Sequence, residues 1–173
     1  MWMFEYFKKE LGVEIHSDAI EVSIGTKKLF IAHGDGLGKG DNGYKLIKKI
    51  FRSSFCQWIF ARLHPNFGFS AANFFSKTSR SKNGPRDKQF NGIENEWLYN
   101  YSKELNTNNK FDFFIFGHRH LPLKIPFESS VYFNLGEWIT YQTYGKFDGE
   151  NFELLQWKNG KEQPYKTLAE NDV

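Results

Sequence analysis

Apolar positions along the chain fall into helical and extended patterns in turn, which predicts an α/β protein. Helical spacing of apolar residues marks the segments 1–12, 44–63 and 90–105. Short alternating or continuous apolar runs predict strands at 20–24, 28–33, 111–116, 131–135, 140–147 and 151–157. We expect the last three strands to form a small antiparallel meander, and the polar tail from Lys158 to be frayed.

Two of these predicted strands end in histidine. The apolar run 29–32 leads into His33, and the run 111–116 leads through Gly117 into His118 and His120. Glycine permits a tight turn, after which the two later histidines either share one face of a continuing strand or diverge on a loop around bound ions. A lone histidine is more often a hydrogen-bonded or surface residue than a ligand. Three imidazoles at strand ends instead predict a metal site, because neutral imidazole is the commonest metal ligand.

Composition narrows the class of protein. The 173 residues are 40% hydrophobic and include 19 Phe, which is enough for one globular domain with a substantial core. The formal net charge of +3 is mild, so charge alone does not imply a nucleic-acid-binding protein. The single cysteine, Cys56, excludes an internal disulfide and fits a reducing cytoplasm. No apolar run approaches the ~20 residues that span a bilayer, so we expect neither a signal peptide nor a membrane anchor.

A second aromatic cluster lies between the two histidine motifs, and a basic segment at 76–88 follows it. The cluster consists of Phe67, Phe69, Phe74 and Phe75. Its rings are either part of the core beside a solvated basic loop, or an apolar surface with a basic rim. An acyl chain next to a phosphate group would suit the second arrangement.

Three short motifs carry a resemblance to a known family. The motifs His33-Gly34-Asp35, Gly117-His118-Arg119-His120 and Leu135-Gly136-Glu137-Trp138 occur in this order, with a helical insert between the first two. The ordered set resembles the calcineurin-like metallophosphoesterases, and within them the UDP-2,3-diacylglucosamine diphosphatases of lipid A synthesis. The resemblance implies part of a sandwich of mixed sheets flanked by helices. It makes residues 1–173 a single partial domain with a helical lid insert at about 44–88.

The same resemblance implies an activity and a location. Members of this family use two divalent metal ions, usually manganese, to hydrolyse the pyrophosphate of a lipid-linked nucleotide sugar. The products are UMP and a diacylated sugar phosphate. We therefore expect a cytoplasmic enzyme that is peripheral to the inner membrane and binds no nucleic acid.

Residue roles follow by position in the matching motifs. His33 and His118 would bind one metal ion, and His120 would bind the other. His118 would also lie nearest the reacting phosphate. Asp35 would contact the metal ligands without binding a metal ion itself. The implied substrate contacts are Asp41, Tyr44, Ser76, Arg80, Asn83 and Arg119. Arg119 stands where the family has Thr, Glu137 stands for Asp, and only the serine of the lid pattern is kept.

Part of the family pattern is absent from the chain. An Asp-x-His motif, a bridging Asp and a Gly-Asn-(His/Arg)-Asp loop would precede the opening helix, and none is present. The resemblance thus implies that the chain corresponds to the C-terminal two-thirds of a longer protein. Imidazoles without the bridging carboxylate leave two divalent ions poorly neutralised, so we expect no catalysis by this fragment alone.

Two other classes of function fit parts of the sequence. A different phosphoesterase of the same superfamily, acting on a nucleotide or a phosphoprotein, would need the histidines but not the aromatic insert. A non-catalytic lipid- or nucleic-acid-binding module would instead use the aromatic residues and the basic segment without metal.

Overall fold

The computed structural model describes residues 2–38, 49–83 and 89–167. Its helices are α1 (Trp2–Leu11), α3 (Ser54–Phe60), α4 (Pro65–Asn83), the 3₁₀ helix η2 (Ile93–Asn95) and α5 (Trp97–Asn106). Its first strands are β1 (Ile20–Ile24), β2 (Lys27–Ala32), β3 (Phe113–Phe116) and β4 (Pro122–Phe127). The remaining strands are β5 (Ser130–Leu135), β6 (Thr143–Phe147), β7 (Phe152–Lys158) and β8 (Lys161–Pro164).

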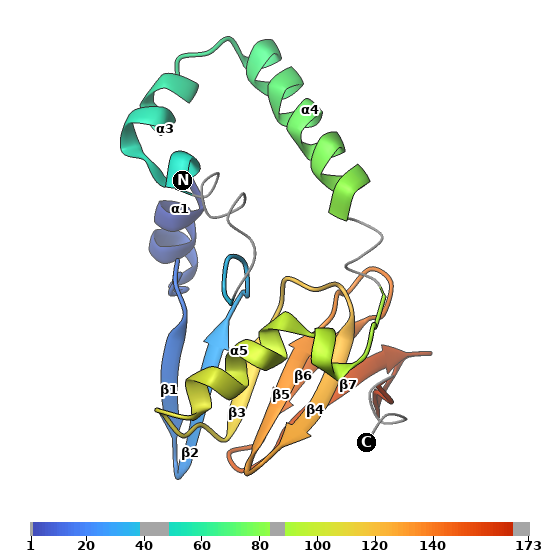
Figure 1. Cartoon of the computed structure of the whole chain (residues 1–173). Coiled ribbons are helices and arrows are strands. Elements are labelled where there is room, and N and C mark those ends of the chain that lie inside the picture. Colours follow the sequence, from blue (N-terminus) through green and yellow to red (C-terminus); the bar gives the residue numbers. More distant parts are fainter. Residues whose placement is uncertain (1, 39–48, 84–88, 168–173) are drawn as a thin grey trace.

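Two sheets and one helix make the body of the protein (Figure 1). A five-stranded mixed sheet has the order β1-β2-β3-β5-β4, in which β2, β3 and β5 are parallel neighbours. A three-stranded antiparallel sheet has the order β6-β7-β8. Helix α5 covers one face of the larger sheet and the smaller sheet covers the other, which confirms the predicted α/β class with mixed sheets flanked by helices.

Strand β3 lies at the centre of both cores. Its side chains alternate between the two faces of the sheet, so Phe114 and Phe116 pack with Leu98 of α5. Phe113 and Ile115 pack on the other face with residues that include Leu154 of the smaller sheet. A strand buried on both faces is apolar at every position, which explains the uninterrupted Phe-rich run.

The first helix and the first hairpin form as predicted. Helix α1 ends before Gly12, whose positive φ of 63° suits a helix C-terminus. The predicted helix over 44–63 is interrupted: helical turns at 49–52 end at Ser53, whose extended backbone precedes α3, and residues 44–48 lie outside the described part. The aromatic cluster that follows is helical, as α4.

Two expectations about the C-terminal part were wrong, and one strand was not predicted. The run 131–135 does not join the meander, because β5 pairs in parallel with β3. The tail does not fray at Lys158, since β8 pairs with β7 and Glu162 hydrogen-bonds to Tyr144 and Lys146 of β6. Strand β4 was not predicted because it contains Pro122 and Pro126, which a strand tolerates at the edge of a sheet, and β4 is an edge strand.

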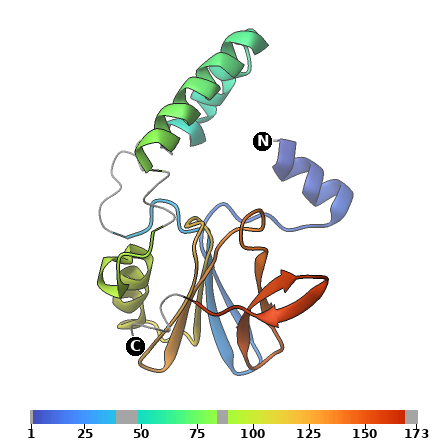
Figure 2. The ribbon, with the colours of Figure 1, turned by 90° about the vertical axis from the view of Figure 1, so that its right-hand side faces the viewer.

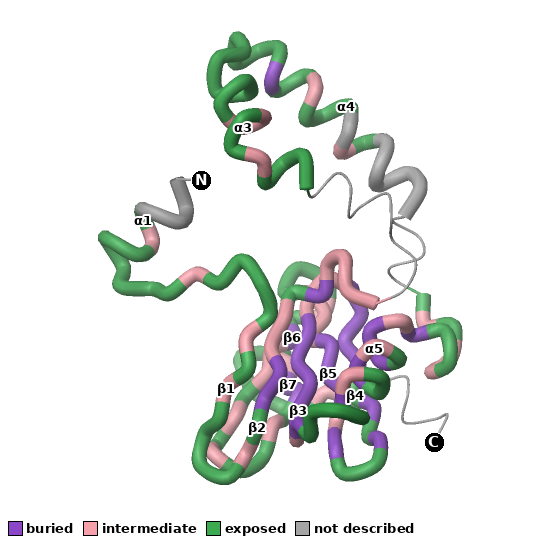
Figure 3. Tube along the Cα trace, turned by 60° about the vertical axis from the view of Figure 1, so that its left-hand side comes forward, coloured by how far each residue is buried: buried purple, intermediate pink, exposed green. Residues whose placement is uncertain are grey.

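The helices α1, α3 and α4 project away from the two sheets (Figures 1 and 2). In Figure 3 the buried positions concentrate in the sheets, while α3 and much of α4 are exposed. A bidentate ion pair from Arg52 to Asp18, at 3.0 and 3.1 Å, joins the start of the helical insert to the segment between α1 and β1. No helix among residues 2–38, 49–83 and 89–167 is long and apolar enough to cross a membrane.

Candidate metal centre

The three short motifs converge at one edge of the larger sheet. Ala32 at the end of β2 is paired with Phe116 at the end of β3, and Phe116 is paired with Asn134 near the end of β5. Because these strands are parallel, their carboxyl ends lie side by side, which is where open α/β sheets bind ligands. The residues that follow each strand therefore share one neighbourhood.

His33 and His118 form a close pair at this edge. Their ring centroids are 5.4 Å apart with the ring planes at 80°. Two imidazoles that bind one ion through nitrogen–metal bonds of about 2.1 Å have ring centres at most about 6.5 Å apart. The observed separation lies inside that limit, so the pair is compatible with a shared divalent ion.

Two glycines make this approach possible. A Cβ on Gly117 would lie 3.2 Å from Nδ1 of His33, and the Gly117 N–H donates to the His33 carbonyl at 3.1 Å. A Cβ on Gly34 would lie 3.2 Å from the Cβ of His118 and 3.0 Å from a methyl carbon of Leu98. Side chains at either position would push the two histidines apart.

His118 has an unusual backbone conformation. Its φ is 53°, in the left-handed region that non-glycine residues rarely occupy. Such a residue costs about 1 kcal/mol or more and persists only where its surroundings hold it. The turn at His118 also settles the question left by the sequence, because residues 118–120 form a loop rather than a continuing strand.

His120 is more exposed than His118, its neighbour in the motif. It is exposed, and its charge is one of the influences that lower the pKa of Glu137, after the larger effect of a hydrogen bond from Thr140. Among the residues that the structure describes, no group of three or more His, Cys, Asp or Glu side chains is arranged to hold a metal ion. The structure thus shows His33 and His118 as a pair, and it shows no larger ligand group that includes His120 among the described residues.

Asn134 connects the sheet to the loop of residues 118–120, the histidine loop. Its fully buried side chain donates to the Gly117 carbonyl at 2.5 Å and accepts from the Gly136 N–H at 3.1 Å. Asn134 was not predicted as a functional residue, although an asparagine inside an otherwise apolar strand is a usable signal.

Arg119 lies beneath the loop instead of facing solvent. Its side chain is 4% exposed, and Nη1 contacts Glu96, itself 1% exposed, at 2.6 Å. Burial raises the pKa of Glu96, and the charge of Arg119 opposes that rise. The structure thus places the guanidinium in a buried ion pair, where the sequence analysis had expected a phosphate contact. Glu96 was not anticipated from the sequence.

The expected lid contacts are only partly visible. Asp41 and Tyr44 lie outside the described residues. Ser76 is half-buried on α4, and Arg80 and Asn83 lie on the same helix, with side chains that are not described. None of these positions is therefore tested.

The large apolar side chains of α3 and α4 are mostly exposed. Phe67 is 65% exposed, Phe69 is 72% and Phe55 is 68%. A hollow of about 550 Å³ lies against α3 and its neighbours, lined mainly by apolar residues that include Phe51, Ile59, Phe60 and Leu63. Of the two arrangements that the sequence left open, the exposed apolar surface describes these residues and the core does not.

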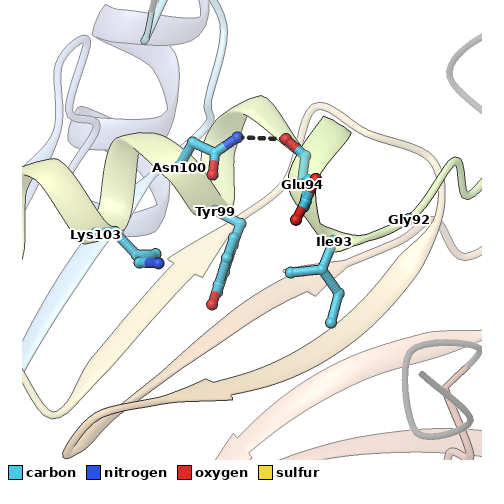
Figure 4. Close-up of a pocket in the computed structure, with 6 residues that line it drawn as sticks. All are labelled: Gly92, Ile93, Glu94, Tyr99, Asn100 and Lys103. Carbon is cyan, nitrogen blue, oxygen red and sulfur yellow. Dashed lines mark hydrogen bonds between the residues drawn. The ribbon is translucent and has the colours of Figure 1, made fainter. Parts of the chain in front are cut away.

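A second hollow, of about 540 Å³, lies between η2 and α5 (Figure 4). Its lining includes Tyr99 and Lys103 of α5 together with Glu94, whose carbonyl accepts a hydrogen bond from Asn100 at 2.8 Å. None of the histidines lines this hollow, so it is separate from the candidate metal centre.

Two proteins that share one name are similar to this chain in sequence. The chain is 30% identical over 167 residues to a UDP-2,3-diacylglucosamine hydrolase of Porphyromonas gingivalis (strain ATCC BAA-308 / W83), which covers 89% of this chain and 64% of the relative. It is 26% identical over 155 residues to the protein of the same name from Vibrio parahaemolyticus serotype O3:K6 (strain RIMD 2210633), covering 87% of this chain and 62% of that relative.

The other comparisons add little. No protein-family model matches the chain. A crystal structure of wild-type Vps29 complexed with zinc, from Entamoeba histolytica, has a TM-score of 0.40 and 11% sequence identity, and covers 88% of this chain and 62% of that chain. This structural likeness is too weak to carry an argument. The sequence comparison is the informative one: this chain is similar to proteins named UDP-2,3-diacylglucosamine hydrolase, and it spans less than two-thirds of their length.

Proposed function

We propose that this chain supplies the histidine side of a two-metal centre that hydrolyses the pyrophosphate of UDP-2,3-diacylglucosamine. The products would be UMP and 2,3-diacylglucosamine 1-phosphate. The observation that carries the proposal is the close pair formed by His33 and His118 at the ends of two parallel strands. The sequence relationship to proteins named for this substrate supports the same conclusion.

The imidazoles have separate tasks in this proposal. His33 and His118 would hold one divalent ion, for which manganese is the proposed identity, and His120 would serve a second ion. Bound ions of this kind polarise phosphoryl oxygens and lower the pKa of a bound water. In this proposal His118 would also contact the reacting phosphate. The left-handed backbone of His118 turns its side chain back towards His33.

In this proposal the carboxylate ligands of the centre lie outside the described residues. The described residues form a histidine pair but no larger ligand group, and two divalent ions need anionic ligands to balance their charge. We propose that the 173 residues are inactive by themselves. A segment carrying the Asp-x-His and Gly-Asn-His-Asp motifs would complete the centre.

In this proposal the helical insert acts as a lid over the substrate. The exposed aromatic side chains of α3 and α4 would cover the acyl chains, since each buried CH₂ contributes about 0.8 kcal/mol. Asp41, Tyr44, Ser76, Arg80 and Asn83 are the proposed contacts to the sugar and phosphate groups. An enzyme that draws such a substrate from a bilayer would work as a cytoplasmic protein at the surface of the inner membrane.

The test measures UMP release from UDP-2,3-diacylglucosamine by the 173-residue chain and by the same chain fused to the carboxylate-bearing segment of a relative. We expect manganese-dependent release by the fusion alone. His118→Ala in the fusion should abolish release, and the exposed His16→Ala should leave it unchanged.

Three outcomes would contradict the proposal. Equal release by both proteins would show that no carboxylate segment is needed. Activity that survives chelation or His118→Ala would exclude the two-metal centre. Phosphate release from nucleotides or phosphopeptides, without UMP release from the lipid substrate, would identify a different phosphoesterase.

A further inference from the structure

The middle residue of the histidine loop is its most buried one. His118 is half-buried and His120 is exposed, while Arg119 between them is 4% exposed. The guanidinium is directed into the protein, where its charge meets Glu96. The loop is therefore fixed through its centre, and the two imidazoles lie on either side of that fixed point.

Arg119 joins this loop to two further segments. Nη1 donates to Oε2 of Glu96, the residue immediately before α5, at 2.6 Å. Nη2 donates to the backbone carbonyl of Gln89, the first described residue after α4, at 2.7 Å. The guanidinium also lies 5.1 Å from the centre of the Trp97 ring, and the same ring lies 6.4 Å from that of His118.

Glu96 is held from its other side as well. The Tyr132 hydroxyl of β5 donates to Oε1 of Glu96 at 3.3 Å, and the Tyr132 side chain is fully buried. Both carboxylate oxygens therefore have partners. The network runs from the central sheet through Glu96 to the histidine loop.

Stability alone is a poor explanation for this pair. Removing two charges from water costs several kcal/mol per ion, and apolar residues of similar volume often replace a buried ion pair without loss of stability. A rigid network of charged hydrogen bonds does, however, restrict the loop to one conformation. His118 needs such restraint because its left-handed backbone is unfavourable by itself.

We propose that Arg119 is a positioning residue, and that its ion pair with Glu96 sets the placement of His118 and His120 relative to His33. This inference rests on the proposed function in that it takes the histidines to be metal ligands. It also accounts for an arginine where the family motif has threonine. A short hydroxyl side chain cannot reach Glu96 and Gln89 together, whereas the guanidinium carries donors for both.

The experiment separates positioning from stability by using three variants of the 173-residue chain. Arg119→Thr removes the network. The triple variant Glu96→Leu, Arg119→Met, Tyr132→Phe replaces all the buried polar partners with apolar groups. Arg119→Lys keeps the charge but cannot make the forked contact. Imidazole nitrogen–proton NMR signals report the environment of each histidine, thermal unfolding reports stability, and a Mn²⁺ titration followed by line broadening reports metal binding.

We expect shifted or broadened His118 and His120 signals in Arg119→Thr and in the triple variant, with Mn²⁺ binding weakened about 10–100-fold in both. The triple variant should keep a melting temperature near that of the unchanged chain. Arg119→Lys should recover part of the signal pattern. His16, an exposed histidine outside this region, should be unchanged in every variant.

The inference fails if the triple variant folds and its His118 and His120 signals match those of the unchanged chain. It also fails if the triple variant does not fold and Arg119→Lys gives the signals of the unchanged chain, because the forked contact would then be dispensable. If neither the unchanged chain nor the fused protein binds Mn²⁺, the proposed function fails. The imidazole signals would still decide whether Arg119 positions the loop.

Discussion

The carbon framework of His118 lies so near Gly34 that a methyl group on Gly34 would come within 3.2 Å of the His118 Cβ. Gly34 also has a φ of 108°, which other residues rarely adopt. Gly149 has the same φ of 108° but has open space where its Cβ would be. This chain therefore contains a matched pair of glycines that separates crowding from backbone strain.

We expect Gly34→Ala to lower Mn²⁺ affinity and to shift the His33 and His118 imidazole signals, because the methyl group must displace either His118 or Leu98. Gly149→Ala should reduce stability by the cost of an unfavourable backbone, about 1 kcal/mol, without changing those signals. NMR and urea unfolding measure the two effects. If the imidazole signals of both variants matched those of the unchanged chain, close packing at Gly34 would not set the histidine geometry.

Asn134→Ala should destabilise the protein by about 1–3 kcal/mol. The substitution leaves the partly buried Gly117 carbonyl and Gly136 N–H without the partner that they share. Amide hydrogen exchange should also become faster at Gly117 and Gly136. Asn109→Ala, at an exposed position before β3, is the control, and a loss of stability as large as that of Asn134→Ala would count against this account.

Phe69→Ser should change the free energy of unfolding by no more than about 0.5 kcal/mol, because the ring is 72% exposed. In the fused protein the same substitution should raise the KM for the diacylated substrate roughly tenfold, which corresponds to about 1.5 kcal/mol of lost apolar contact.

Phe114→Ala provides the contrast, since a fully buried ring should cost about 3–5 kcal/mol of stability. An unchanged KM in Phe69→Ser, together with a large drop in melting temperature, would place the Phe69 ring in a core instead of a binding surface.

The free energy of unfolding should depend on pH through the ionisation of Glu162. Hydrogen bonds from Lys146 and then from Tyr144 hold the pKa of this exposed carboxyl below its ordinary value of 4.5. A carboxyl with a lowered pKa in the folded state stabilises the fold above pH 4.5, and this contribution disappears as the pH falls through the lowered pKa. Glu162→Gln should thus be slightly less stable than the unchanged chain at pH 7.

The difference between the two proteins should shrink as the pH falls from 7 through 4.5 towards 3, which urea unfolding across this range can test. Glu128→Gln, in the turn between β4 and β5, controls for the loss of one surface charge. A difference that stayed constant between pH 7 and pH 3 would show that ionisation of Glu162 plays no part.

The residues at strand ends were predictable because two physical patterns coincide there. An apolar run that ends in Gly and His marks both the strand and the turn, so the amino-acid sequence is enough to place His33 and His118 at neighbouring strand ends. Parallel pairing of β2 with β3 then brings them together. The strand β8 had no such signal, since its four residues are all exposed and polar or proline.

The contacts between buried polar side chains could not be predicted from the sequence. Glu96 and Arg119 are 23 positions apart, and nothing in their local patterns indicates that they face each other in the core. Charged residues are expected at the surface, so Arg119 in a histidine motif suggested a phosphate contact. Only the fold shows that its side chain lies on the inner side of the loop.

The pairing of β2 with β3 has a consequence for how this protein folds and varies. The hydrogen bond between Lys28 and Asp112 at the start of these strands joins positions 84 residues apart, and the whole helical insert lies within that loop. Closing a loop costs entropy that grows only with the logarithm of its length, so doubling the loop would add about 0.6 kcal/mol. The histidine pair can form only once this long loop has closed. The insert can nevertheless lengthen or shorten at little cost, which allows its shape to diverge while His33 and His118 keep their places.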